Sequence, residues 1–105
     1  MAGYIPYFQK KLLRLTEQEQ RLTELIAGNA SAAELLDVAE QVRAARVRAI
    51  RSKQAELPPS ERNAAQAKQF AELVQQWLGL SSEAIVEVYR LPERQRSAAA
   101  RKATA

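Results

Sequence analysis

The chain contains no cysteine and no histidine. Without cysteine it can form no disulfide bond, no thiolate nucleophile and no cysteine-ligated zinc site. Without histidine it lacks the side chain that most often acts as a general base and as a transition-metal ligand. Carboxylates, lysines, arginines, tyrosines and hydroxyls remain, and they make a poor catalytic set. We therefore expect a protein that is not an enzyme, with no cofactor and no metal.

Long hydrophobic runs are also missing. No stretch approaches the roughly 20 apolar residues that a helix needs to span a bilayer, and residues 1–6 lack the basic and apolar regions of a signal peptide. These absences predict a cytoplasmic protein that does not engage a membrane. The sequence has 20 alanines, which favour helices but bury little surface. A thin core of this kind favours association with itself, as a homodimer or higher oligomer, or with another helical protein.

Apolar spacing and turn signals predict four helices. Pro6 suits the first helical position, and the apolar residues that follow recur in alternating steps of three and four. Gly28 offers a left-handed conformation that would stop this helix. Ser31 begins a capping box, Pro58 ends the second helix, and Gly79 ends the third. The expected helices cover about residues 6–27, 31–57, 59–78 and 82–91.

Because the turn between the first two helices is short, they should form a long antiparallel hairpin. The sequence thus predicts an all-α fold, a three- to four-helix bundle built on this hairpin, as a single domain over residues 1–92. Trp77 is expected to anchor the third helix to the hairpin. Residues 93–105 have no large apolar side chain and carry much of the net charge of +4. We expect them to form a basic tail that is a frayed helix or disordered.

Three charged residues occupy positions where the pattern calls for apolar side chains. Glu19 interrupts the apolar stripe of the first helix, and Arg46 and Lys53 fall within that of the second, at 100° per residue. Across an antiparallel hairpin, Glu19 would lie within a turn of Arg43 and Arg46, which predicts a partly buried pair with one of them. Such a pair can fix register and partner choice without adding stability, so a Glu19→Leu variant is expected to keep its thermal stability. Alternatively, Arg46 and Lys53 line a polar cleft for an anionic ligand.

The functional prediction is a non-enzymatic helical interaction or oligomerisation module, an adaptor or assembly subunit that docks through its apolar seams. The residues expected to carry the interaction are Ile5, Phe8, Leu12, Glu19, Val42 and Arg46. The alternative is a nucleic-acid-binding accessory protein, because basic residues gather on the second helix and in the tail. Its candidate contacts are Arg43, Arg48, Arg51, Arg94, Arg96, Arg101 and Lys102.

Three family patterns match short parts of the chain, and none supports a family assignment. Residues 71–89 resemble a helix-turn-helix motif, but Gln75 stands where such motifs pack a small residue, and Glu83 and Glu87 would repel phosphate. The long helix followed by shorter ones resembles the all-helical chorismate mutases, which need more inward basic side chains. Residues 77–79 resemble the Trp-x-Gly motif of secreted helical hairpins, but they lie far from the central turn.

Overall fold

The computed structural model describes residues 7–104, so the predicted roles of Ile5 and of Pro6 lie outside the described residues. These residues form α-helices and one short 3₁₀ helix, and the described part of the chain contains no β-strand. The all-helical prediction is therefore confirmed. The helices are α1 (Tyr7–Ala27), α2 (Ala32–Ala55), α3 (Ala64–Gly79), α4 (Ser82–Tyr89) and α5 (Glu93–Ala103), with the 3₁₀ helix Pro59–Glu61 between α2 and α3.

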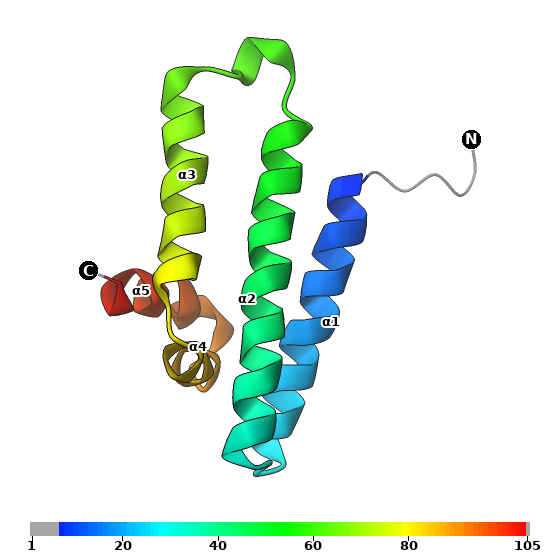
Figure 1. Cartoon of the computed structure of the whole chain (residues 1–105), viewed down its shortest axis with the longest axis vertical. Coiled ribbons are helices and arrows are strands. Elements are labelled where there is room, and N and C mark those ends of the chain that lie inside the picture. The colour runs from blue at the N-terminus through cyan, green and yellow to red at the C-terminus, as the bar shows by residue number, and fades with distance from the viewer. Residues whose placement is uncertain (1–6, 105) are drawn as a thin grey trace, which may run out of the picture.

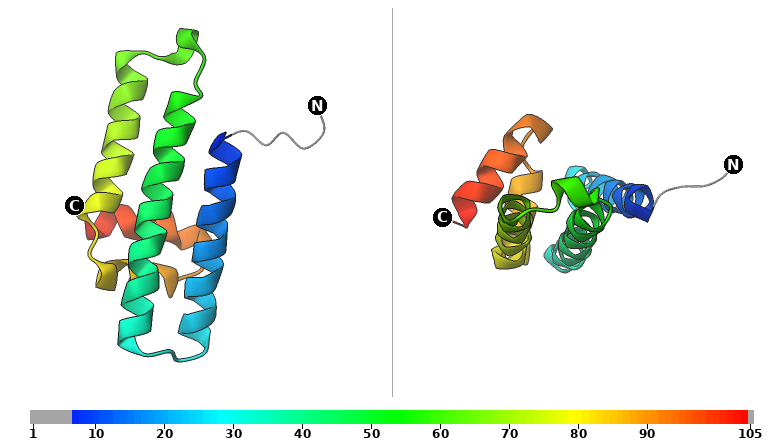
Figure 2. Two further views of the ribbon diagram at one scale, coloured as in Figure 1. Left: turned by 45° about the vertical axis from the view of Figure 1, so that its right-hand side comes forward. Right: turned by 90° about the horizontal axis from the view of Figure 1, so that it is seen from above.

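The first three helices lie side by side, with α1 and α3 flanking α2 and running opposite to it (Figure 1). The two short helices α4 and α5 lie across one side of this row, toward the end that holds the α1–α2 turn (Figure 2). Helix α2 contacts α1, α3 and α4, while α5 packs against α4 and α3. Side chains of α2 therefore face three different neighbours and one open side.

The turn between α1 and α2 differs in detail from the expectation. Asn29, and not Gly28, adopts the left-handed conformation, with φ of 54°. Its N–H donates to the Ile26 carbonyl at 3.2 Å and the Ala30 N–H to the Leu25 carbonyl at 3.0 Å, the paired bonds of a Schellman turn. Asparagine adopts the left-handed conformation at low energetic cost. Asn29 therefore terminates α1, one residue after the predicted position at Gly28.

The connection between α2 and α3 is longer than predicted, because α2 ends at Ala55 and α3 begins only at Ala64. The Arg62 side chain folds back and donates from Nε and Nη2 to the carbonyls of Leu57 and Ala55, at 2.7 and 2.9 Å. The Asn63 side chain accepts from the Gln66 N–H at 2.9 Å. Asparagine is a strong N-cap residue, so α3 begins after Asn63 and not at residue 59 as expected.

The C-terminal segment corrects the prediction of a frayed or disordered tail and of a domain that stops at residue 92. Residues Glu93–Ala103 form α5, which packs against α4 and α3. Ala100 is completely buried, and Thr104 Cγ2 lies 3.8 Å from the position that a Cβ on Gly79 would occupy. Small side chains let this helix approach closely. The sequence pattern did not predict the packing of α5, because the pattern marks buried positions by large apolar residues and α5 is buried through an alanine.

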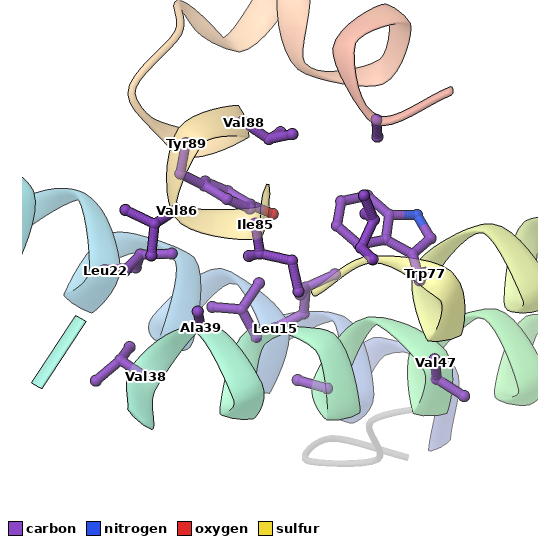
Figure 3. Close-up of a cluster of buried hydrophobic side chains, with 14 of the residues drawn as sticks. Leu15, Leu22, Val38, Ala39, Val47, Trp77, Ile85, Val86, Val88 and Tyr89 are labelled. Carbon is purple, nitrogen blue, oxygen red and sulfur yellow. The ribbon is translucent and has the colours of Figure 1, made fainter. Parts of the chain in front are cut away.

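The core lies between α4 and the α1–α2 pair and extends to α3 (Figure 3). Trp77 is buried in it, as predicted, and Ile85 is fully enclosed. The apolar seams of the first two helices thus close on one another and on α4 within one chain. The large apolar side chains left exposed in the described part of the chain are Leu12, Leu13, Leu73 and Leu78.

Candidate functional site

Glu19 and Arg46 form the centre of a polar cluster in which four helices meet. Arg46 Nη2 donates to Glu19 Oε2 at 2.7 Å and to the Tyr89 hydroxyl oxygen at 3.2 Å. The Tyr89 hydroxyl donates in turn to the same carboxylate oxygen of Glu19. The guanidinium carbon of Arg46 lies 4.4 Å from the centre of the Trp77 ring. The cluster therefore links α1, α2, α3 and α4, and we call Glu19, Arg46, Trp77 and Tyr89 the Arg46 cluster.

The cluster is largely removed from water. The side chains of Arg46 and Glu19 are 28% and 23% exposed. Within residues 7–104, the Nε atom of Arg46 is buried and has no hydrogen-bond acceptor. The aromatic face of Trp77 compensates part of this cost, because a ring quadrupole attracts a desolvated cation.

Burial and hydrogen bonding in the cluster shift the pKa values of Tyr89 and Arg46. Burial raises the pKa of the Tyr89 hydroxyl, the charge of Arg46 opposes this shift, and the hydrogen bond to Glu19 adds to it. Burial lowers the pKa of Arg46, but the charges and hydrogen bonds of Tyr89 and Glu19 outweigh it, so its pKa is raised. A protonated phenol and a permanent cation are suited to holding helices together, since neither is poised to exchange a proton near neutral pH.

The prediction of a partly buried Glu19 pair is confirmed, with Arg46 as the partner. Arg43, the other candidate, donates to the Leu80 carbonyl and pairs with Glu40 at 3.0 Å. Lys53 is exposed and lies 5.9 Å from the centre of the Phe8 ring. Arg46 and Lys53 thus face different neighbours, and the expected cleft between them does not form a shared site.

Most residues predicted to dock a partner make contacts within the chain instead. Val42 is fully buried, and Glu19 and Arg46 are bonded to each other. Phe8 is half-buried, and its N–H donates to Glu56 Oε1 at 2.8 Å, which ties the start of α1 to the end of α2. Leu12 is 43% exposed and stays available.

The residues predicted to contact nucleic acid divide between two helices. Arg48 and Arg51 are exposed on α2. The Arg43 side chain instead donates to the Leu80 carbonyl and pairs with Glu40. Arg96 donates to the Leu91 carbonyl at 3.1 Å and stacks 4.8 Å from the centre of the Tyr89 ring. Helix α4 lies between α2 and α5 (Figures 2 and 3). The candidates exposed on α5 are Arg94, Arg101 and Lys102.

A groove between α2 and α3 brings an exposed leucine beside three of these arginines. Leu78 of α3 faces Arg43, Arg48 and Arg51 of α2 across a space of about 430 Å³. The other lining residues are Glu40, Ala44 and Val47. Glu40 is the one carboxylate among them, and it is paired with Arg43.

Leu78 and three cations of α1 were not among the predicted site residues. Lys10, Lys11 and Arg14 line a hollow that they share with Arg48. An antiparallel pair of helices that turns at residues 29–30 places Lys11 across from Arg48, with Lys10 and Arg14 within one turn of it. The same alignment of the two helices, extended to the charged residues of the first helix, would have predicted that these three cations lie near Arg48.

Among residues 7–104, no group of three or more carboxylates is placed to hold a metal ion. None of the helices in the described part of the chain is long and apolar enough to cross a bilayer. Comparison with protein-family models, curated proteins and solved structures finds no match to this chain.

Proposed function

We propose that this chain is a non-enzymatic interaction module that docks a helix of another protein in the groove between α2 and α3. The observation that carries the proposal is the position of Leu78, which is 49% exposed beside Arg43, Arg48 and Arg51. A half-exposed leucine on one wall and a row of arginines on the other suit an amphipathic helix laid along the groove. The partner helix would carry apolar residues flanked by carboxylates.

The floor of the groove supports this geometry. Val47 is buried and Ala44 is small, so a partner side chain can approach the α2 backbone closely. Within residues 7–104, Arg48 and Arg51 form no ion pair. Carboxylates of a partner would provide charge-assisted hydrogen bonds that these side chains lack in the single chain.

Another helical protein is a better partner than a second copy of this chain. The seams that were expected to drive self-association contain Leu15, Leu22 and Val42, and all three are buried. The exposed Leu12 and Leu13 adjoin Lys10, Lys11 and Arg14 along the chain. Bringing two such surfaces together would place like charges in contact, which opposes association.

The nucleic-acid alternative, with the contacts that the sequence predicted on α2 and in the C-terminal segment, has weaker support. It requires several cations along one continuous track. The exposed arginines of α2 and the cations of α5 belong to helices separated by α4. A duplex that contacts one group therefore leaves the other largely unused.

Fluorescence anisotropy of a labelled, idealised peptide tests the proposal. The peptide has leucines spaced by three and four and glutamates on both flanks, and a second peptide has lysines in place of the glutamates. We expect the acidic peptide to bind the full chain and the basic one to remain free. Leu78→Ser should weaken binding about tenfold, since an apolar anchor contributes roughly 1.5–3 kcal/mol. Leu73→Ser is the matched control, because Leu73 is exposed on the same helix outside the groove.

Equal binding of both peptides, or equal effects of the two leucine substitutions, would refute the groove as the docking site. Light scattering across a concentration series adds a separate readout. A rise to twice the monomer mass that Leu78→Ser does not alter would favour self-association through another surface. A short duplex that binds with a steep salt dependence, falling about fortyfold from 50 to 200 mM salt for three phosphate contacts, would favour the nucleic-acid alternative.

A further inference from the structure

A hollow between α1 and α2 is lined by four cations and one alanine. Lys10, Lys11 and Arg14 of α1 and Arg48 of α2 surround a space of about 310 Å³, with Ala45 at its base. No carboxylate is among the lining residues in the described part of the chain. We call this hollow the cation cradle. Four like charges around one space repel each other unless an anion lies between them.

The position of two of these cations on α1 also runs against helix electrostatics. Lys10 lies in the first turn of α1, Lys11 follows it, and this first turn has no acidic residue. The N-terminal end of a helix carries partial positive charge and is stabilised by anions. The carboxylate of Glu56 bonds the Phe8 N–H at this end and is outside the lining of the cradle. The helix thus places its lysines where an external anion would be favoured.

Two acidic residues lie beside the cradle. Arg14 and Arg48 also line an adjoining hollow that contains Asp37 and Glu40. Asp37 accepts from Gln41 Nε2 at 3.2 Å, and Glu40 accepts from Arg43 Nη2 at 3.0 Å. Within residues 7–104 neither arginine of the cradle forms an ion pair. The two carboxylates therefore lie on the side of the cradle that faces the α1–α2 turn, and the four cations outnumber them.

We propose that Lys10, Lys11, Arg14 and Arg48 bind the phosphate groups of a polyanionic ligand. Phosphate suits this set better than a single carboxylate, because adjacent phosphates carry several charges and many acceptor oxygens. The two arginines present planar forks that match phosphate oxygens, and the lysines act as mobile point charges. A linear polyphosphate chain and successive phosphates of a nucleic-acid backbone offer the same chemistry. The cradle is a second site, since Arg14 lines it and Leu78 lines only the groove.

Isothermal titration calorimetry on the full chain tests this inference with two probes, inorganic triphosphate and a short DNA duplex. We expect triphosphate to bind at low salt. Arg14→Gln and Arg48→Gln should each weaken binding about tenfold, as expected for loss of a charge-assisted hydrogen bond. Both side chains are exposed, so circular dichroism should show an unchanged fold. Arg21→Gln is the matched control, since Arg21 is an exposed arginine of α1 outside the cradle.

The duplex arm identifies the source of the phosphates. If the duplex binds more tightly than triphosphate and also loses affinity in an Arg51→Gln variant, the cradle is part of a nucleic-acid surface. If triphosphate binds and the duplex does not, the ligand is a small polyphosphate compound. The inference is overturned if neither probe binds, or if Arg21→Gln weakens binding as much as Arg14→Gln. Peptide binding in the groove should survive Arg14→Gln, so the two sites fail or hold separately.

Discussion

Arg46 and Glu19 are joined by a hydrogen bond of 2.7 Å from Nη2 to Oε2, and Tyr89 donates to the same carboxylate oxygen. One carboxylate of α1 therefore holds an arginine of α2 and a phenol of α4. A partly buried pair of this kind does little for stability relative to apolar replacements of both residues, but removing one partner leaves the other desolvated and unpaired.

Replacing Glu19 by leucine should lower the free energy of unfolding by about 2–4 kcal/mol, since Arg46 and Tyr89 lose their shared acceptor. The sequence alone suggested retained stability, and the third member of the cluster reverses that expectation. Urea unfolding followed by circular dichroism measures the change. Glu87→Gln is the control, because the exposed Arg90–Glu87 pair should contribute at most about 0.5 kcal/mol.

A double Glu19→Leu, Arg46→Leu variant should recover part of the stability that Glu19→Leu loses. No recovery would argue against a buried unpaired charge as the cause of that loss.

Tyr89 should ionise only at a pH above its ordinary range. Because burial raises its pKa in the folded chain, the unfolded chain releases the phenolic proton first as the pH rises. Its contribution to stability is fully present below about pH 10 and is lost as the pH rises further toward the raised value. The near-ultraviolet absorbance of phenolate, compared between the wild type and Tyr89→Phe, isolates Tyr89 from Tyr4 and Tyr7. A Tyr89 signal that titrates near pH 10 in a folded chain would contradict the burial of its hydroxyl.

Trp77→Ala should lower the free energy of unfolding by about 3–5 kcal/mol, the range for truncating a large buried aromatic side chain. The loss includes the cover that the ring provides for Arg46. Trp77→Phe keeps part of the buried surface and should cost less. Because Trp77 is the only tryptophan, unfolding must be followed by circular dichroism. Equal losses for the two variants would mean that the indole packs more loosely than its burial indicates.

Ala100→Leu should destabilise the chain by about 1–3 kcal/mol, because an enclosed alanine leaves no room for extra methyl groups. Ala98→Leu adds the same atoms on an exposed position of α5 and should change stability little. Thermal unfolding of both variants makes the comparison. If the two substitutions behave alike, α5 does not dock and the earlier expectation of a frayed tail stands.

Local sequence signals were sufficient for much of the secondary structure. Ser31 accepts from the Glu34 N–H and Ser81 from the Ala84 N–H. Both serines are N-caps, and the helices begin at or within one residue of the expected positions 31 and 82. The antiparallel register also predicted a pair of Glu19 with Arg43 or Arg46, and Arg46 is the partner. These features succeed because they depend on neighbours within a few residues or across one short turn. Local signals did not predict which residue of the turn is left-handed. Gly28 and Asn29 both tolerate this conformation, and the hydrogen bonds of the turn determine that Asn29 adopts it.

The sequence by itself determined that the chain is helical, where α2 and α4 begin, and that a charged pair joins the first two helices. Only the tertiary structure decided that Tyr89 and Trp77 complete this pair, that an alanine-lined helix docks at the C-terminal end, and that Leu78 and Arg14 face Arg48 from opposite sides. Helix formation follows from local propensity and capping, which a linear pattern records. The direction in which a side chain points between helices depends on how whole faces pack together, and no local pattern records that.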